Sequence, residues 1–579
     1  MTLKSICLAT TALALLPVLA AAGELKFAEV PFASDDAAKR QAIASDRIMI
    51  DGAEYPIGYN VLARSGDVLG GAVFGALVDQ AGAPLMGDAS TSADFTSLLQ
   101  VGGKLYSVTH FESRPGAMYL TELAQAEDGT LTAVSTKPVE FADVGGLWVP
   151  CAGSVTPWGS HLGSEEYPPD AEAIEKAASI ADIDDYAKPM ARYFGVDPET
   201  MDLAQFNAVF NPYAYGYPTE ITVAEDGSAR AAKHYAMGRV AVELAYVMPD
   251  AKTAYISDDG TNVGLFRFVA DTAGDLSAGT LYAAKWIQTS GEGAGAADLE
   301  WIDLGHASDA DMRAAIDARP AFSDLFEVAA LAEDGTCADG FAPSNAEGTM
   351  QCLKVRDGMD AVASRLETRR YASMKGATTE FRKMEGITHN PDTGVLYLAM
   401  SEVAKAMTGG YKTDLKGNDA VQLAENGCGA VYELALDQSY TATTMKTLVA
   451  GVPTDYAADA VEAGNTCDIN GIANPDNITY IPGYNTLIIG EDTGSGHQND
   501  AIWAMDLATG GLTRIFSTPY GSETTSPYFY PNINGHAYLV AVVQHPYGES
   551  DEDKLIEAGD ARAYVGYVGP MPAMGAALQ

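Results

Sequence analysis

The segment Cys151–Tyr167, CAGSVTPWGSHLGSEEY, contains the residues with the clearest potential for chemistry. Its glycines, proline and tryptophan indicate a turn, and the strand that follows ends in two adjacent carboxylates, Glu165 and Glu166. Adjacent residues on a strand point to opposite faces of a sheet. We therefore expect one glutamate to face a central channel and the other to serve a neighbouring site or the solvent. A surface pair of acids after a structural turn is the alternative.

Further acidic residues occur at expected strand ends or in turns, where most acids are ordinary surface residues. Glu243 and Glu385 differ because each lies inside an apolar stretch, where an unpaired carboxylate is costly. Each of them needs a metal ion, a basic side chain or donated hydrogen bonds. The other acids at such positions are Glu112, Asp258, Asp259, Asp476, Asp492 and Glu523.

Motifs of several common enzyme classes are missing from the sequence. The eight histidines are scattered and do not have the spacing of a zinc site. There is no G-x-S-x-G nucleophile elbow, no Walker loop and no G-x-G-x-x-G fingerprint. These absences argue against a serine hydrolase, a nucleotide-binding protein and a dinucleotide-dependent enzyme, and they leave metal chemistry on oxygen ligands.

The charge of the chain is strongly negative, with 35 Lys and Arg against 78 Asp and Glu and a formal net charge of −43. Nucleic acid and anionic membranes are therefore poor partners, because each approach would be repulsive. A dense carboxylate surface is typical of proteins in saline surroundings. Carboxylates are also the ligands that Ca²⁺ prefers. We therefore expect most of the acids to lie on the surface and some of them to bind calcium.

Several motifs resemble, in the same order, those of the PhoX family of bacterial alkaline phosphatases. The run C-A-G-x-x-T-P-W-G-x-x-L-x-x-E-E at Cys151–Glu166 is similar to the family signature, and VQHP at 543–546 is a second specific match. The resemblance spans about residues 100 to 550. Weaker matches between these motifs are GRVAVE (238–243), AYISDD (254–259), KMEGITHNPDTGVLY (383–397), NPDNI (474–478) and GSETTSP (521–527).

The resemblance implies a β-propeller whose channel holds a cluster of Ca²⁺, with Fe³⁺ as a further ion. It implies hydrolysis of phosphate monoesters, with the phosphate bound among ions that polarise its oxygens. It assigns catalytic roles to Glu385, Lys383 and Arg382, the two cations as candidates to clamp the phosphate. The metal-binding positions that it implies are Ser164, Glu165, Glu166, Glu243, Glu385, Asp476 and Glu523.

Two positions depart from the family pattern. Ser164 stands where the family has an iron-associated cysteine, and a hydroxyl is a weaker and harder ligand than a thiolate. Lys383 stands where the family has an arginine, so that a point charge replaces a bidentate fork. Cys151, further upstream, is an alternative thiolate ligand. A calcium-stabilised binding propeller without catalysis and a calcium-dependent, lactonase-like hydrolase are the alternative functions.

The secondary structure that would position these residues is predominantly short β-strands separated by acidic, glycine-rich turns. Such units over several hundred residues, without long alternating helices, favour an all-β propeller over a sandwich or an α/β fold. No linker divides the chain, so we expect residues 23–579 to form one domain. Helical insertions are predicted near 168–205, 308–331 and 354–374.

Met1–Ala22 has the layout of a secretory signal peptide, with a lysine, an apolar run and small residues before the expected cleavage site. Because the segment lacks an arginine pair, we expect the general secretory route. The mature protein is then expected in the periplasm or outside the cell, as a monomer without stable membrane insertion.

Five cysteines lie beyond the expected signal peptide, an odd number that leaves at least one thiol unpaired in an oxidising compartment. Cys337 and Cys352 share one loop and could pair, and Cys428 and Cys467 flank another irregular stretch. Cys151 would then be free, although the sequence alone does not fix the connectivity.

Overall fold

The computed structural model describes residues 22–85, 87, 89–415 and 419–575. The expected signal peptide, Met1–Ala22, lies outside the described residues except for its last position. Within the described ranges, no helix is long and apolar enough to cross a membrane.

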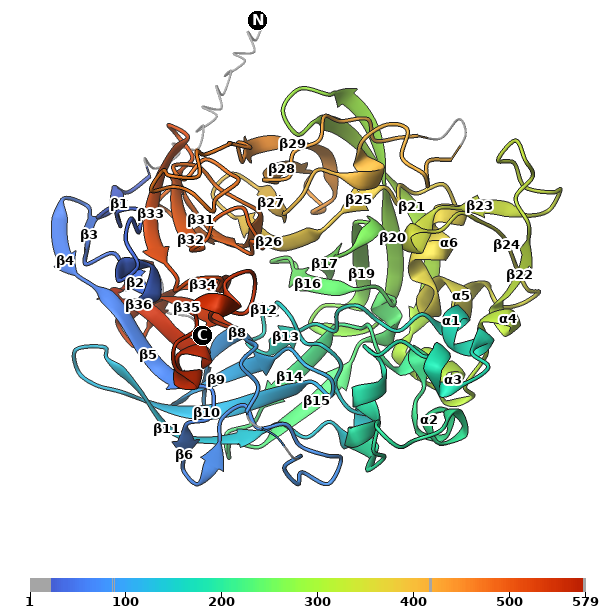
Figure 1. The fold of residues 1–579 in the computed structure, drawn as a ribbon, viewed down its shortest axis with the longest axis horizontal. Coiled ribbons are helices and arrows are strands. Elements are labelled where there is room, and N and C mark those ends of the chain that lie inside the picture. Colours follow the sequence, from blue (N-terminus) through green and yellow to red (C-terminus); the bar gives the residue numbers. More distant parts are fainter. Residues whose placement is uncertain (1–21, 86, 88, 416–418, 576–579) are drawn as a thin grey trace, which may run out of the picture.

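Six antiparallel blades of four strands surround a central axis in the described part of the chain (Figure 1), which confirms the predicted all-β propeller. The first two blades contain β8 (Ala93–Val101), β9 (Lys104–Phe111), β10 (Ala117–Gln125) and β11 (Leu131–Pro138), then β12 (Ser154–Val155), β13 (His161–Gly163), β14 (Thr219–Val223) and β15 (Ala229–Lys233). The next two contain β16 (Val242–Val247), β17 (Thr253–Asp258), β19 (Phe266–Thr272) and β20 (Asp275–Ser290), then β26 (Met384–Asn390), β27 (Val395–Met400), β28 (Ala430–Leu436) and β29 (Ala442–Ala450). The last two contain β30 (Pro475–Ile481), β31 (Thr486–Glu491), β32 (Ala501–Asp506) and β33 (Gly511–Ser517), then β34 (Glu523–Ile533), β35 (His536–Gln544), β36 (Tyr564–Pro572) and β5 (Gly58–Arg64).

The ring is closed by pairing between the two ends of the chain. Strand β5, near the N-terminus, pairs with β36, near the C-terminus, and so completes the last blade. A long hairpin of β20 and β21 (Ala296–Ser308) joins the third blade to the fourth through β21–β29 pairing. Closure leaves few exposed strand edges and holds the inner strands of all blades around one channel.

The strands are buried because each blade packs between two neighbours. Strands β30 and β31, PDNITYI and TLIIGE, are buried along their whole length, as expected for strands covered on both faces. One core between the last two blades joins Ile488 and Ile502 to Leu539 and Val568. The hydrophobic effect therefore stabilises the contacts between blades as well as those within them.

Short helices gather on one side of the ring, beside the second and third blades (Figure 1). They lie in or next to the three segments expected to be helical insertions. They are α1 (Ala171–Lys176), α2 (Leu203–Val209), α3 (Asp309–Asp317), α4 (Phe322–Leu325), α5 (Asp360–Leu366) and α6 (Thr368–Met374). The small sheets outside the blades are β1 (Leu25–Phe27) with β3 (Arg47–Ile50) and β4 (Ala53–Pro56), β6 (Val68–Leu69) with β7 (Ala72–Val73), β18 (Thr261–Val263) with β25 (Phe381–Arg382), and β22 (Phe326–Ala329) with β24 (Gln351–Val355) and β23 (Ala342–Ser344), while β2 (Ile43–Ala44) extends the blade of β33.

Both suggested disulfides are confirmed. Cys337 is bonded to Cys352 and Cys428 to Cys467, and Cys151 is a free cysteine.

A buried histidine ties the helical insertions to the second blade. His234 lies between Glu220 of β14, with Nε2 and Oε2 2.9 Å apart, and Asp309 of α3, with Nδ1 and Oδ2 3.2 Å apart. Burial opposes protonation of His234, but the two carboxylates outweigh it and raise its pKa from 6.5 to about 9. His234 therefore keeps its positive charge, and its attraction to the two carboxylates, at pH values well above the ordinary pKa of histidine.

We predict that this contact gives a pH-dependent share of the stability. Because the pKa is raised on folding, the contribution is complete below pH 6.5 and is lost as the pH rises through 9. His234→Gln should lower the free energy of unfolding by up to about 3 kcal/mol at pH 6, and the loss should shrink at pH 10. Thermal unfolding at both pH values tests this, with His306→Gln at an exposed ion pair as the control. An equal loss at both pH values would contradict the account.

Candidate metal centre

The first strand of each blade starts, and the second strand ends, at the same mouth of the central channel. Antiparallel pairing produces this arrangement, as in the pairs Val242 with Asp258 and Pro475 with Glu491. Residues that can bind metal occur at these positions in every blade. They are Asp94, Cys151, Glu243, Glu385, Asp476 and Glu523 at or near the strand starts, and Glu112, Glu166, Asp259, Glu402, Asp492 and His545 just beyond the strand ends.

Four of the acids at strand starts lie where the strand register shifts. The pairing is interrupted just after the first residue of β8, β16, β26 and β30, and the interruptions contain Asp94, Glu243, Glu385 and Asp476. A β-bulge changes the direction of a side chain and is frequent next to active sites. The bulges therefore let carboxylates from four blades turn toward one point.

Apart from Asp94, the side chains at this mouth of the channel line a cavity of about 370 Å³, which we call the acidic cavity. Within the described chain its wall contains ten carboxylates against two permanent cations, Arg382 and Lys383. Its full lining is Glu112, Cys151, Glu166, Tyr167, Glu243, Asp259, Arg382, Lys383, Glu385, Glu402, Asn474, Asp476, Asp492, Gly494, Glu523, His545 and Glu549.

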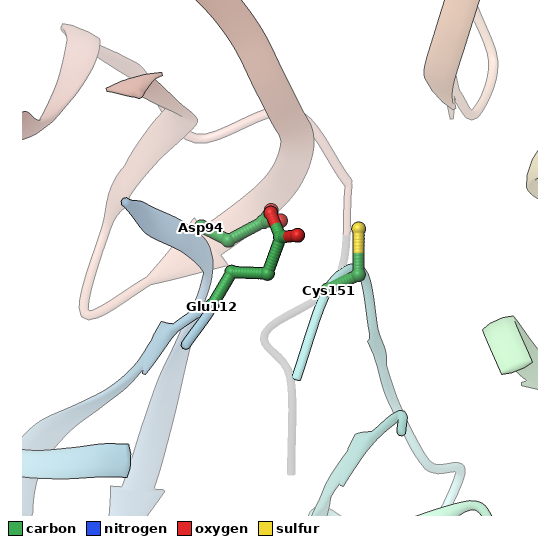
Figure 2. A group of neighbouring side chains, drawn as sticks. All are labelled: Asp94, Glu112 and Cys151. Atoms are coloured by element: carbon green, nitrogen blue, oxygen red, sulfur yellow. The ribbon is translucent and has the colours of Figure 1, made fainter. Parts of the chain in front are cut away.

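Three overlapping groups have ligand atoms within 4.8 Å of one another. In the first, the carboxylates of Asp94 and Glu112 and the sulfur of Cys151 point toward one another (Figure 2). The other groups are Cys151 with Glu166 and Glu243, and Glu243 with Glu385 and Asp476. Cys151 and Glu243 are each shared by two groups, so the three form one continuous set of ligand atoms.

The carboxylates repel one another strongly in this arrangement. Burial raises the pKa of Glu243, and the charges of Glu385 and Asp94 raise it further. Burial also raises the pKa of Asp476, with Glu243 as its strongest charged neighbour. The pKa of Glu385 is raised to about 8, first by burial and then by Asp259. The protein alone therefore does not supply the positive charge that these carboxylates need.

Lys383 is the cation that lies deepest among the acids. Its Nζ is 3.3 Å from Glu385 Oε1, 3.4 Å from Asp259 Oδ2 and 3.9 Å from Asp492 Oδ2. Its backbone has φ of 45°, which an L-residue rarely adopts and which is often found at functional sites. Arg382 is instead bound at the side, with Nε 2.9 Å from Glu402 Oε2.

The family of this chain follows from comparison with known proteins. A family model described as alkaline phosphatase PhoX matches residues 113–547, more than half of the chain. The chain belongs to the alkaline phosphatase PhoX family. It is therefore a phosphoric ester hydrolase of the alkaline phosphatase type.

Solved structures agree with this assignment at the level of the fold. The structure of Pseudomonas fluorescens PhoX in complex with vanadate is 17% identical, covers 94% of this chain and 98% of its own, and has a TM-score of 0.59. A periplasmic gluconolactonase of Pseudomonas aeruginosa is 10% identical over 87% of this chain and 98% of its own, with a TM-score of 0.30, too weak a similarity to bear on function. No curated protein matches the chain.

The residues that the PhoX resemblance implied do not all reach the acidic cavity. Glu166, Glu243, Glu385, Asp476 and Glu523 line it, together with Arg382 and Lys383. Glu165 and Ser164 do not. The carboxylate of Glu165 is fully buried, 2.8 Å from Lys233 Nζ, and accepts hydrogen bonds from the N–H groups of Trp148 and Gly216.

Ser164 supports the free cysteine and does not itself line the acidic cavity. Its hydroxyl accepts a hydrogen bond from the N–H of Cys151, 3.0 Å away. The antiparallel hairpin of β12 and β13 brings these two residues close together, although 13 positions separate them in the sequence. The sulfur that can bind a metal is therefore that of Cys151.

In three blades the second strand is followed by or ends in a pair of adjacent acids, and the two side chains of each pair point to opposite sides. The second acid of each pair, Glu166, Asp259 or Asp492, lines the acidic cavity. The first acid points into the blade and is satisfied there, as Glu165 is by Lys233. In the other two blades Asp258 pairs with Arg369, and Glu491 accepts a hydrogen bond from Trp503. One member of each pair thus stabilises the strand end and the other serves the site.

Several residues at the channel mouth have no role in the expectations from the sequence. Asp94, which joins a ligand group without lining the acidic cavity, is not among the expected site residues, and Glu112, Asp259 and Asp492 are acids to which the sequence gives no role. Oδ2 of Asp94 is buried and has no hydrogen-bond partner in the described chain, as expected of a ligand atom without its ion. Their positions in the sequence could have identified them, since each lies at the start of an apolar strand near the channel or directly after such a strand.

The donor set fits the metals that the family resemblance implied. Carboxylate oxygens suit Ca²⁺, and one thiol among them adds a softer ligand of the kind that iron accepts. The raised pKa values and the unpartnered Asp94 oxygen are both relieved by a bound cation. The residues present are thus consistent with a cluster of hard ions that includes one site near Cys151.

We predict different effects for substitution of the two neighbouring glutamates, on stability for Glu165 and on metal binding for Glu166. Glu165→Gln should destabilise the protein by about 3 kcal/mol, because it leaves Lys233 buried without a counter-charge. Glu166→Gln should leave the unfolding temperature of the metal-free protein nearly unchanged, because burial and the charges of Asp259 and Glu243 raise the pKa of Glu166 and the amide resembles the neutral carboxyl group that it replaces, but it should reduce the bound metal. Thermal unfolding and elemental analysis of both variants test this. The assignment would be contradicted if Glu165→Gln lost its bound metal without being destabilised while Glu166→Gln kept its metal.

Proposed function

We propose that the acidic cavity binds a cluster of metal ions that includes calcium, with iron as a further candidate ion near Cys151. We propose that the protein uses this cluster to hydrolyse phosphate monoesters. The observation that carries the proposal is the set of three overlapping ligand groups in a wall of ten carboxylates and two cations. The proposed ligands are Asp94, Glu112, Cys151, Glu166, Glu243, Glu385, Asp476 and Glu523. When bound, such a cluster supplies Lewis acid chemistry that polarises the phosphoryl oxygens and neutralises developing charge.

The side chains around the cluster have distinct tasks in this proposal. Lys383 binds a phosphate oxygen as a point charge, since its ammonium group already lies among Glu385, Asp259 and Asp492. Arg382 lies at the edge of the cavity, where Glu402 fixes its guanidinium group. The ion pairs of both cations hold them in place before the substrate arrives, which lowers the cost of ordering them.

Asn477 orients two of the proposed ligands from behind the cavity. Its side-chain N–H₂ group donates to Glu243 Oε1 and to Asp476 Oδ1, each 3.0 Å away. Its carbonyl oxygen accepts from the N–H of Ser526, 2.8 Å away, which fixes the orientation of the amide. Hydrogen bonds of this kind set the direction of metal ligands and contribute to metal affinity.

The site of action proposed is the periplasm or the outside of the cell. The support is the signal-peptide layout of Met1–Ala22 in the sequence and the presence of two disulfides, which persist in oxidising compartments. The monomeric state stays a prediction.

We predict that removal of one ligand abolishes turnover while the fold is kept. Glu385→Gln should lower kcat/KM for p-nitrophenyl phosphate at least about 100-fold, with unchanged circular dichroism, because the carboxylate belongs to the ligand set. Glu300→Gln, at an exposed strand position paired with Lys285, is the matched control and should behave like the wild type. Turnover and metal content like those of the wild type in Glu385→Gln would remove this residue from the site.

We further predict that calcium removal stops the reaction reversibly. Treatment with a calcium chelator should bring p-nitrophenyl phosphate hydrolysis to background, and added calcium should restore it where magnesium does not, because Mg²⁺ requires a more regular octahedral site. Turnover that persists after the chelator has removed the metal would exclude the proposed mechanism. Bound calcium without turnover in the wild type would favour the non-catalytic binding propeller.

A further inference from the structure

The insertion between β13 and β14 brings an aromatic side chain to the edge of the acidic cavity. Tyr167 lines the cavity and is 38% exposed, and its ring centroid is 6.4 Å from that of Tyr186, which the insertion carries. Trp148 is fully buried behind both residues. Its Nε1 donates to the carbonyl of Tyr167 over 3.1 Å, and its ring centroid is 5.9 Å from that of Tyr186. The two tyrosines are therefore held firmly in place.

Arg114 packs against Tyr186 at this aromatic edge. It follows Glu112 of the acidic cavity by two residues, in the loop between β9 and β10. Its guanidinium carbon is 3.5 Å from the centroid of the Tyr186 ring, a close cation–π contact. We call Arg114, Tyr167 and Tyr186 the rim cluster.

The Arg114 guanidinium group has no carboxylate within ion-pair distance in the described chain, and its charge interacts with Glu112 only from further away. Within the described chain no ion pair below 4.0 Å involves it, and its Nε is buried without a hydrogen-bond acceptor. Acids are abundant in this protein, at 78 against 35 basic residues. The other arginines near the cavity do have partners, Arg382 with Glu402 and Arg369 with Asp258.

We propose that the rim cluster is a subsite for the alcohol part of the phosphate ester, and that it selects esters whose alcohol part carries a second anionic oxyacid group. The proposal rests on the proposed phosphatase function. With the phosphate in the acidic cavity, the alcohol part leaves past Tyr167 toward Tyr186 and Arg114. Elsewhere around the cavity the excess of carboxylates repels a second negative charge, whereas the guanidinium group of Arg114, held against Tyr186 and without a carboxylate partner in the described chain, can bind a carboxylate or phosphate.

Two substrates that differ in one charge test the proposal. Phenyl phosphate and 4-carboxyphenyl phosphate have the same ring and the same scissile bond, and only the second has an anionic group on the alcohol part. The wild type should have the higher kcat/KM for 4-carboxyphenyl phosphate. Arg114→Gln should lower kcat/KM about tenfold for that substrate and less than twofold for phenyl phosphate. Arg114→Lys should recover part of the loss, because it keeps the charge without the fork.

The controls separate the possible failures. Arg230→Gln removes an exposed arginine of β15 and should leave both substrates unaffected. An equal fall for both substrates in Arg114→Gln, or no fall for either, would overturn the subsite while leaving the phosphatase function intact. A wild type that hydrolyses neither substrate would overturn the proposed function, and the subsite with it.

Discussion

Repulsion between carboxylates is the force that the centre of this propeller has to contain. Acids from all six blades converge at one mouth of the channel, and burial and mutual charge raise the pKa values of Glu243, Asp476 and Glu523. An open sheet would relieve such repulsion by separating its strands. Closure of the ring through β5 and β36 prevents this, and the apolar cores between blades provide the stabilising free energy.

A second layer of charges supports the strand ends from behind. Glu165 with Lys233 and Asp258 with Arg369 are buried pairs next to residues of the acidic cavity. Glu491 has no lysine or arginine partner in the described chain and is instead held by His497, whose Nδ1 lies 2.9 Å from Glu491 Oε2, and by hydrogen bonds from Trp503 and backbone N–H groups. These interactions position the backbone at the mouth without adding charge to the cavity. The division of labour within each acid pair follows from strand geometry, since successive side chains point to opposite faces.

The sequence predicted the propeller, both disulfides and seven of the residues that line the acidic cavity, because each of these depends on local patterns or on collinear motifs. It could not show which member of the Glu165–Glu166 pair faces the channel, since alternation separates the two without giving the direction. The resemblance implied Ser164 as a ligand because it aligns with the family's cysteine, whereas the structure places the sulfur of Cys151 at the site. Asp94 precedes residue 100, where the resemblance begins, and only the packing of the first blade against the second brings it beside Cys151.

The most direct test is a crystal structure of the purified, calcium-loaded protein, with anomalous scattering data to locate and identify the ions. The account predicts ions in the acidic cavity with Glu243, Glu385 and Asp476 oxygens at about 2.3–2.6 Å from calcium, and any iron close to the Cys151 sulfur. Lys383 would then be free to contact phosphate. A cavity that contains only water, with Lys383 still paired to Glu385 and Asp259, would contradict the central claim.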